Sequence, residues 1–209
     1  MGQFDGTVAI VTGGASGIGR ATALAFDREG AHVIIVDRDR DRAIATLREL
    51  GRASAVVGDV VQPATRQETV SAASAVGWPV RYLVNCAASF LAKGEDATDA
   101  DWDLVLGVNV KATALMASAV LPLIRAAGGG AIVNVASISG YIAQPNRWTY
   151  NATKGAILAL TRCQALDLAR DNIRVNSVSP GTIWTAELER MTGGDRATWE
   201  PIFGAHHML

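Results

Sequence analysis

Cysteine is scarce in this sequence, which contains only Cys86 and Cys163 among its 209 residues. Two cysteines cannot build the disulfide framework that holds small secreted domains together, and we interpret both as reduced, buried, small hydrophobic side chains. An excess of one charge is also missing, because 19 basic residues face 20 acidic ones and the formal net charge is −1. Without a basic face or tail, the composition argues against a nucleic-acid partner.

The sequence also has little that indicates export, membrane insertion or metal binding. Residues 1–5 lack the basic and apolar blocks of a signal peptide, and no apolar run free of Gly, Pro and charge is long enough to cross a bilayer. His206 and His207 are adjacent and therefore badly placed to share one metal ion, and no other ligand cluster accompanies them. We expect a cytoplasmic protein with no membrane partner and no metal site.

The sequence does have enough apolar residues, 49% of the total, to build a large core. Short β-branched runs alternate with longer helical patterns, which is typical of an α/β fold with a parallel sheet and crossover helices. Residues 1–209 fit one such domain, with no repeat and no linker. The strands are predicted at Val8–Val11, His32–Asp37, Ser54–Val57, Tyr82–Asn85, Ala131–Val135 and Arg174–Ser177.

Helices are predicted between several of these strands. The first has an apolar face and ends at Gly30, and the second runs from about Arg40 to Leu50. Thr98 and Asp101 have the spacing of a capping box, which predicts that a further helix begins there.

The most informative motif is a tyrosine and a lysine four residues apart, Tyr150 and Lys154, with Ser137 thirteen residues before the tyrosine. On a helix, which we expect to continue to about Ala169, this spacing places both side chains on one face. A cation there stabilises the phenolate, so Tyr150 is predicted to exchange a proton at neutral pH more readily than a free tyrosine. The chain has only three Tyr and three Lys, so chance is a poor explanation of the spacing.

A glycine-rich turn, Thr12-Gly-Gly-Ala-Ser-Gly-Ile-Gly19, follows the first predicted strand and opens a helix. Glycines in that place let backbone N–H groups and the helix N-terminus approach a pyrophosphate without Cβ clashes. The Lys and Ser/Thr that a P-loop needs are missing, which disfavours nucleotide triphosphate hydrolysis. The turn predicts a dinucleotide site, with the cofactor-binding residues Gly13, Ser16, Gly17, Ile18 and Gly19.

Asp37 ends the second predicted strand about 20 residues after the glycines, where a carboxylate can accept hydrogen bonds from both ribose hydroxyls of an adenosine. The same charge repels a 2′-phosphate, so NAD is predicted over NADP. Arg38 is the competing feature, because a guanidinium in that place can bind a phosphate. Asp59 and Val60, after the third predicted strand, are also predicted to bind the cofactor, with Asp59 either an acceptor for the adenine amino group or a helix N-cap.

Taken together, these motifs resemble the short-chain dehydrogenase/reductase family. The glycine spacing is similar to that of its single-domain subtype, T-G-x-x-x-G-x-G, and further matches follow in the family's order over essentially the whole chain. These are Leu83-Val84-Asn85, Asn109 within Val108-Asn109-Val110, Val133-Asn134-Val135-Ala136-Ser137, Arg174-Val175-Asn176 and Ser179-Pro180-Gly181-Thr182. The resemblance implies a doubly wound, Rossmann-type parallel sheet of strand order 3-2-1-4-5-6 that binds NAD between strands 1 and 4.

The resemblance also implies roles for individual residues. Tyr150 is the general acid/base for the substrate oxygen, and Lys154 lowers its pKa and holds the nicotinamide ribose. Ser137 positions the substrate oxygen, and Asn109 holds a water that links Lys154 to solvent. The cofactor site is completed by Asn85, Pro180, Gly181, Ile183 and Thr185, together with Tyr150 and Lys154.

Two features depart from the family pattern. Cys86-Ala87-Ala88 stands where the family has Asn-Ala-Gly, which fills space beside the nicotinamide ribose but removes no catalytic group. The sequence ends at Leu209, before the helix and seventh strand with which family members usually continue. We therefore expect a sheet without its usual seventh strand and a substrate-covering segment at residues 182–209, in a chain that is truncated or incompletely recorded.

The function that the resemblance implies is NAD-dependent hydride transfer between nicotinamide and a secondary alcohol or ketone. Polar groups beside two indoles favour a small hydroxylated or carboxylate-bearing substrate, with Arg147 either a partner for a carboxylate or a surface arginine. These side chains are Ser139, Gln144, Asn146, Arg147, Trp148 and Trp184.

One alternative is a nicotinamide-binding module or truncated fragment without turnover. Another, an isomerase or dehydratase that retains its NAD, is disfavoured by the glycine spacing. The family also implies a homodimer or homotetramer.

Overall fold

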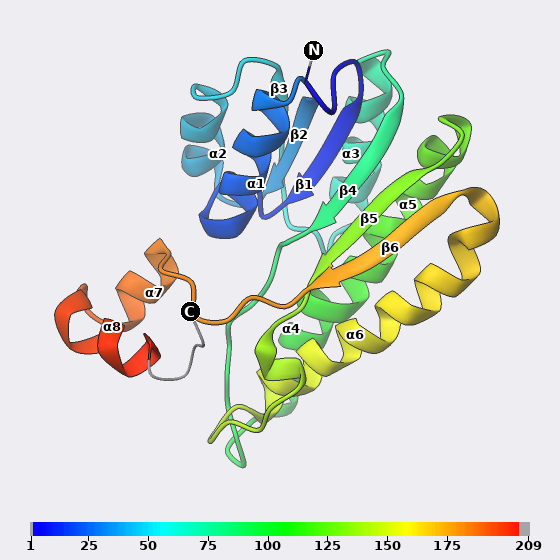
Figure 1. The fold of residues 1–209 in the computed structure, drawn as a ribbon. Helices are drawn as coiled ribbons and strands as arrows, with labels where there is room; N and C mark the ends of the chain where they lie inside the picture. Colours follow the sequence, from blue (N-terminus) through cyan, green and yellow to red (C-terminus); the bar gives the residue numbers. More distant parts are fainter. Residues whose placement is uncertain (1, 205–209) are drawn as a thin grey trace.

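The computed structural model describes residues 2–204 and shows one parallel sheet covered by helices (Figure 1). Its six strands have the order β3-β2-β1-β4-β5-β6, and each neighbouring pair is parallel. The strands are β1 (Val8–Thr12), β2 (His32–Asp37), β3 (Ala53–Val57), β4 (Val80–Asn85), β5 (Gly130–Val135) and β6 (Ile173–Val178). The predicted fold class and strand order are confirmed, and five of the six strands are one or two residues longer than predicted.

The helices alternate with the strands, as the crossover pattern predicts. They are α1 (Gly17–Arg28), α2 (Arg40–Leu47), α3 (Pro63–Ala75), α4 (Asp99–Val105), the π-helix η1 (Leu106–Ala112), α5 (Thr113–Ala126), η2 (Ile138–Gly140), α6 (Trp148–Leu168), η3 (Ala169–Asp171), α7 (Ala186–Met191) and α8 (Arg196–Gly204). The second helix is therefore three residues shorter than predicted. Helix α3 was not predicted. About half of its residues are polar, and its start is marked by Pro63 in its first turn.

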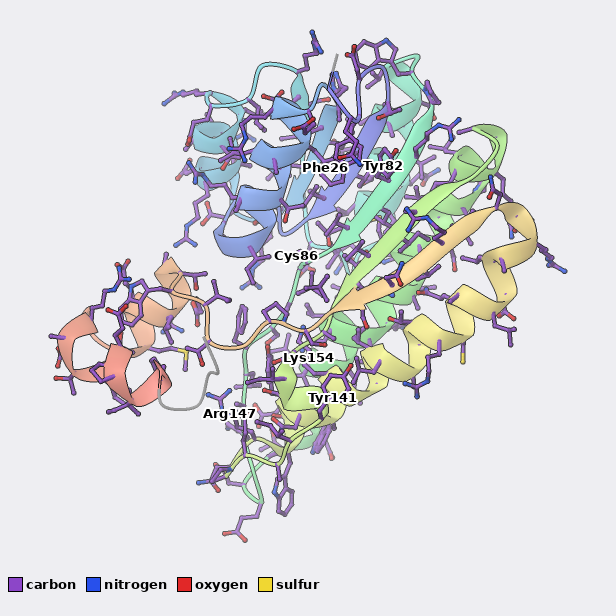
Figure 2. The ribbon with its side chains drawn as sticks, viewed as in Figure 1. Phe26, Tyr82, Cys86, Tyr141, Arg147 and Lys154 are labelled. Atoms are coloured by element: carbon purple, nitrogen blue, oxygen red, sulfur yellow. The ribbon has the colours of Figure 1, made fainter. Side chains whose placement is uncertain are left out.

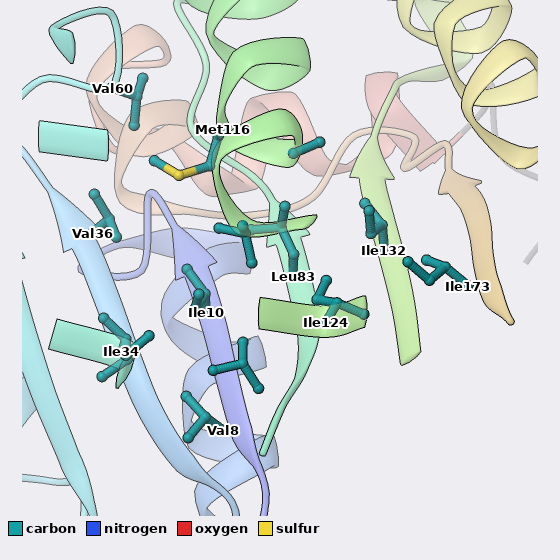
Figure 3. Close-up of a cluster of buried hydrophobic side chains, with 14 of the residues drawn as sticks. Val8, Ile10, Ile34, Val36, Val60, Leu83, Met116, Ile124, Ile132 and Ile173 are labelled. Carbon is teal, nitrogen blue, oxygen red and sulfur yellow. The ribbon is translucent and has the colours of Figure 1, made fainter. Parts of the chain in front are cut away.

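The core has two layers because successive residues of a strand point to opposite faces of the sheet. On one face Val11 and Ile35 pack with Ala23 of α1 and Ala43 of α2. On the other face, Figure 3 shows strand residues that include Ile10, Ile34 and Leu83 together with Met116 and Ile124 of α5. Every residue of β1 is buried, which is why this strand reads as a continuous apolar run.

This winding places a crevice at the carboxyl ends of β1 and β4. The chain crosses one face of the sheet to go from β1 to β2, whereas α3, α5 and α6 lie on the other face. The chain therefore leaves β1 and β4 toward opposite faces of the sheet, and open α/β sheets bind ligands at the carboxyl ends of such a pair of strands. In Figure 1 the helices α7 and α8 extend from the same end of the sheet.

The cysteines differ from their predicted environment. Both are free thiols, as predicted, but Cys163 is exposed and Cys86 is only partly buried. Cys163 lies in α6 on the face turned away from the sheet, so an apolar neighbourhood in the sequence did not produce burial.

One helical stretch of residues 2–204, Asp99–Ala126, is long and apolar enough to cross a membrane by length and composition alone. It contains Gly107, Lys111 and Pro122, and part of it packs into the core of this protein. Packing into the core thus accounts for part of its apolar character, since 39% of the apolar window is buried. In the same described part of the chain, no group of three or more metal-ligating side chains is present, and His206 and His207 lie outside it.

The predicted capping box at the start of α4 is present. The Thr98 hydroxyl accepts a hydrogen bond from the Asp101 N–H, and the Asp101 carboxylate accepts one from the Thr98 N–H at 2.9 Å. We expect Thr98→Ala to lower the free energy of unfolding by about 1 kcal/mol, because it leaves a helix N–H without a partner. Urea unfolding measures this change. The exposed Ser71→Ala in α3 is the control, and an equal change in both variants would contradict a stabilising cap.

Candidate active site

The glycine-rich turn lies at the carboxyl end of β1 and leads into α1. Gly13 has a φ of +65°, and a Cβ added there would lie 2.9 Å from the Cα of Ala87. Gly17 has a φ of +48°, and its added Cβ would lie 3.3 Å from the Thr185 side chain. Only glycine suits both positions, so the bare backbone of the turn faces the loop after β4 and the start of α7. Ser16, Ile18 and Gly19 belong to the same turn, as the N-cap and first turn of α1.

Asp37 connects the end of β2 to this turn. One carboxylate oxygen accepts a hydrogen bond from the Ala15 N–H at 3.1 Å, and the other accepts one from the Asp39 N–H at 3.0 Å. A negative charge therefore lies beside the glycine turn, at the place that the sequence predicts. Arg38 next to it is exposed and forms no ion pair within residues 2–204.

Asp59 closes the turn that precedes α3. Its carboxylate accepts from the Val61 N–H at 3.1 Å, and its carbonyl accepts from the Gln62 N–H at 2.9 Å. Asp59 therefore accepts a backbone hydrogen bond just before α3, as an N-cap does, but the N-cap residue of α3 is Gln62. Its neighbour Val60 is buried with the core on the α3 side of the sheet.

Thr12 and Asn85 shape the crevice between β1 and β4. The Thr12 hydroxyl accepts hydrogen bonds from the N–H groups of Cys86 at 3.0 Å and Ala87 at 3.1 Å, which fixes the loop after β4. Asn85 donates to Asn134 at 2.9 Å, whereas its own Oδ1 is buried and has no partner in the described chain. A buried acceptor without a donor is rare in proteins and indicates a place where a bound molecule can donate.

Ser137 and Tyr150 meet at the end of β5 and the first turn of α6. They are buried, with 8% and 7% exposure, and their side chains are hydrogen-bonded. The Ser137 hydroxyl also accepts from the Ser139 N–H at 3.1 Å. Burial raises the pKa of the Tyr150 phenol, while the bond with Ser137 and the positive charge of Arg147 act in the opposite direction. The pair can present a hydroxyl and a phenol to one substrate oxygen.

Lys154 lies one helical turn after Tyr150, as the spacing predicts. Its ammonium donates to the Val135 carbonyl at 2.8 Å and lies 5.6 Å from the centre of the Tyr150 ring. Burial lowers the pKa of Lys154 to about 8. The expectation that Lys154 lowers the pKa of Tyr150 stays a prediction. The ammonium lies near the phenol ring, and the positive charge of Arg147 also favours the phenolate.

Asn109 lies inside the π-helix η1, a wider turn that often occurs at functional sites. Its amide donates to the Ser89 carbonyl and to the Thr153 hydroxyl, both at 3.0 Å, and its Oδ1 accepts from the Ser89 N–H at 2.7 Å. Both donors are thus used to hold the loop after β4 against α6. The side chain keeps only acceptor capacity for the water that the family resemblance assigns to it.

The loop between β6 and α7 closes the crevice on a further side. The Pro180 carbonyl accepts from the Ile138 N–H at 3.1 Å, which joins this loop to the residue after Ser137. Thr185 caps α7 and lies next to Gly17. Gly181 and Ile183 lie between these two anchor points, so the structure brings the predicted loop residues to the crevice.

Two residues near Tyr150 were not identified from the sequence. Phe90 stacks on Tyr150 with ring centroids 6.0 Å apart and an interplanar angle of 25°, while 54% of its surface stays exposed. Thr149 is fully buried, donates to the Leu91 carbonyl at 3.1 Å and accepts from the Lys93 N–H at 2.9 Å. The loop of Phe90 has no periodic pattern, so only the tertiary structure reveals these contacts.

The crevice fits a dinucleotide by its own chemistry. The bare glycine turn at a helix start suits a pyrophosphate, the Asp37 carboxylate suits ribose hydroxyls, and the unpaired Asn85 oxygen suits a donor. The Ser137, Tyr150 and Lys154 side chains lie beyond them along the same sheet edge. Fold and site together define a dinucleotide-binding α/β protein of the Rossmann type.

A family model described as short chain dehydrogenase matches residues 7–194. The chain therefore belongs to the short-chain dehydrogenase/reductase family, whose members are oxidoreductases that bind a nicotinamide cofactor and act on alcohol or carbonyl groups. Among curated relatives, it is 40% identical to cattle dehydrogenase/reductase SDR family member 4 over 207 residues, which are 95% of this chain and 73% of that protein. It is 37% identical to rat SDR family member 6 over 192 residues, 90% of this chain and 76% of that protein.

Solved structures of similar fold include members of the same family. A Burkholderia xenovorans protein assigned to the short-chain dehydrogenase/reductases superposes with a TM-score of 0.91 and 34% identity, covering 100% of this chain and 85% of its own. L-sorbose reductase from Gluconobacter frateurii, in complex with NADPH and L-sorbose, gives a TM-score of 0.85 and 34% identity, covering 95% and 80% of the two chains.

Proposed function

We propose that this protein is an NAD-dependent oxidoreductase that interconverts a secondary alcohol and a ketone on a small, polar, hydroxylated substrate. The observation that carries the proposal is the hydrogen-bonded, buried Ser137–Tyr150 pair with Lys154 one turn further along α6. A protein that only binds a dinucleotide needs no such pair at the end of the crevice.

The bound nicotinamide supplies the hydride acceptor for oxidation and the hydride donor for reduction. Tyr150 takes the proton from the alcohol oxygen or gives one to the ketone oxygen, and Ser137 donates a hydrogen bond to the same oxygen. The Lys154 ammonium lies behind the phenol and has N–H groups for the nicotinamide ribose. Asn109 fixes the loop that carries Phe90 against the site.

The choice of NAD over NADP depends on Asp37 and Arg38. The Asp37 carboxylate lies at the end of β2 beside the glycine turn, where its charge disfavours a 2′-phosphate. The exposed Arg38 is the feature that supports the opposite choice, and the similar L-sorbose reductase was solved with NADPH. We favour NAD because the carboxylate is held in place by two backbone donors, whereas the guanidinium is not held.

A fluorescence titration with NADH and NADPH tests this choice. Asp37→Asn keeps an oxygen for the Ala15 N–H but removes the charge, so we expect the preference for NADH over NADPH to fall by about tenfold. Arg38→Gln is the matched neighbour and should leave NADH affinity unchanged. Tighter binding of NADPH by the wild type, lost in Arg38→Gln, would assign the discriminating role to Arg38.

The rival proposal is a nicotinamide-binding module or fragment without turnover. NADH binding without oxidation of any alcohol in a broad panel would favour it. We also propose a homodimer or homotetramer, since α4 and α6 are in contact and carry Leu104 and Leu166, which are 47% and 80% exposed. A cytoplasmic location is likewise a proposal.

A further inference from the structure

Arg147 is a positively charged residue at the start of α6, the helix that carries the Tyr150 phenol. It occupies the N-cap position of α6, three residues before Tyr150, and its charge opposes the effect of burial on that group. Side chains three residues apart on a helix have Cβ atoms about 5–6 Å from each other. Figure 2 shows Arg147 and Lys154 at the same end of the molecule. A small molecule whose oxygen contacts Tyr150 is therefore within reach of the Arg147 guanidinium.

Arg147 has no acidic partner within residues 2–204, although it is half-buried. Six other arginines do have one: Arg20, Arg42, Arg52, Arg125, Arg190 and Arg196. The nearby Lys93 is neutralised by Asp101 at 3.2 Å. A partly desolvated guanidinium without a counter-charge is unfavourable, and it favours the arrival of an anion.

The backbone around Arg147 is fixed on both sides. Asn146, the residue before it, has a φ of +55° and packs against Gly94, whose added Cβ would lie 3.2 Å from the Asn146 Cα. Thr149, two residues after it, is held by Leu91 and Lys93 as described above. These contacts fix the backbone from which the Arg147 side chain extends, so the start of that side chain has a defined place relative to Tyr150.

We propose that Arg147 binds a carboxylate of the substrate, and that the substrates of this enzyme are short hydroxy acids and the corresponding oxo acids. The planar guanidinium fork matches a planar carboxylate with two parallel hydrogen bonds. This inference rests on the proposed function and narrows its substrate class. Arg147 is a substrate-binding residue, and Tyr150 remains the acid/base.

The reaction balances with groups already named. In the oxidation, the hydroxyl proton goes to Tyr150 and the hydrogen on the carbinol carbon leaves as hydride to the oxidised nicotinamide. The products are the oxo acid, the reduced nicotinamide and one proton. The carboxylate stays bound to Arg147 throughout, so it orients the carbinol carbon and takes no part in bond changes.

The test compares acids with amides that differ only in charge. Lactate, 3-hydroxybutyrate and 4-hydroxypentanoate, each as both enantiomers, vary the distance from carboxylate to hydroxyl, and their primary amides serve as neutral counterparts. With NAD, we expect the wild type to prefer the best acid over its amide by about 10- to 100-fold in kcat/KM. Arg147→Gln should remove this preference mainly by loss on the acid, and Arg147→Lys should restore part of it.

The control variant is Arg162→Gln, an exposed arginine of the same helix without an ion pair in the described chain, which should keep the preference. A second readout is calorimetric binding of butyrate, which lacks the hydroxyl, to the NADH complex. Butyrate should bind the wild type and the Arg162→Gln variant, and bind the Arg147→Gln variant at least tenfold more weakly.

The outcomes separate this inference from the proposed function. Two outcomes would overturn the role of Arg147 and leave the proposed function intact. One is turnover of amides or neutral alcohols as fast as acids. The other is an equal loss of acid and amide activity in Arg147→Gln. No turnover of any alcohol would overturn the proposed function. In that case, butyrate binding that depends on Arg147 would still support the carboxylate site, and its absence would contradict it.

Discussion

Tyr150→Phe is expected to reduce turnover of the best alcohol or ketone substrate by about 10²- to 10⁴-fold, the usual contribution of a positioned acid/base. The substitution removes only the phenol oxygen, which exchanges the proton with the substrate. Because the ring keeps its stacking with Phe90, the packing is preserved. Steady-state kinetics measures the loss, and a fluorescence titration should show NADH affinity within about twofold of the wild type.

Tyr141→Phe provides the matched control, since Tyr141 is 70% exposed and lies in the loop that precedes α6. It should leave turnover unchanged. Near-normal turnover in Tyr150→Phe would contradict the role of Tyr150 as the acid/base. A large and equal loss in both variants would point to the loop rather than to the phenol. Because burial raises the pKa of Tyr150, oxidation should become faster as pH rises, since only the phenolate accepts the alcohol proton.

Lys154→Met is expected to remove most activity and at the same time to stabilise the fold at neutral pH. The Lys154 side chain is 4% exposed, and burial lowers its pKa from 10.5 to about 8. That difference corresponds to a cost of about 3 kcal/mol for holding the ammonium in the folded state. Methionine fills a similar volume without charge, so we expect a net gain of roughly 1–3 kcal/mol after loss of the hydrogen bond to Val135.

The pH dependence of this gain has a definite sign. Between about pH 8 and pH 10.5 the unfolded chain binds the lysine proton and the folded protein does not, so wild-type stability rises with pH in that window. The advantage of Lys154→Met should therefore shrink between pH 7 and pH 10. Urea unfolding of both proteins at the two pH values measures this. A constant or growing difference would mean that burial of the ammonium is not costly.

The gain in stability with loss of activity would identify Lys154 as a group retained for function. Leu160→Met, a partly buried apolar residue of the same helix, is the control for the chemistry of methionine itself. It should change stability by less than about 1.5 kcal/mol and should show no dependence on pH.

Much of the architecture follows from local patterns in the sequence. The alternation of β-branched runs with helical segments was sufficient to predict the parallel sheet. The family resemblance was sufficient to predict its strand order. By contrast, α3 was not predicted because about half of its residues are polar and they show little periodicity. Cys163 was predicted to be buried and is exposed, because it lies on the outward face of α6 together with Leu166, an apolar residue that is 80% exposed.

The site shows the same division. The four-residue spacing of Tyr150 and Lys154 and the glycine-rich turn are local features. The sequence by itself therefore determined that Tyr150 and Lys154 share a helix face and that the glycine-rich turn lies at a strand end. Only the tertiary structure decided that Asn109 holds Ser89 and that Phe90 covers Tyr150. A local pattern is set by the period of a helix or strand. A contact between distant segments depends on how loops pack, and neighbouring residues carry no signal of it.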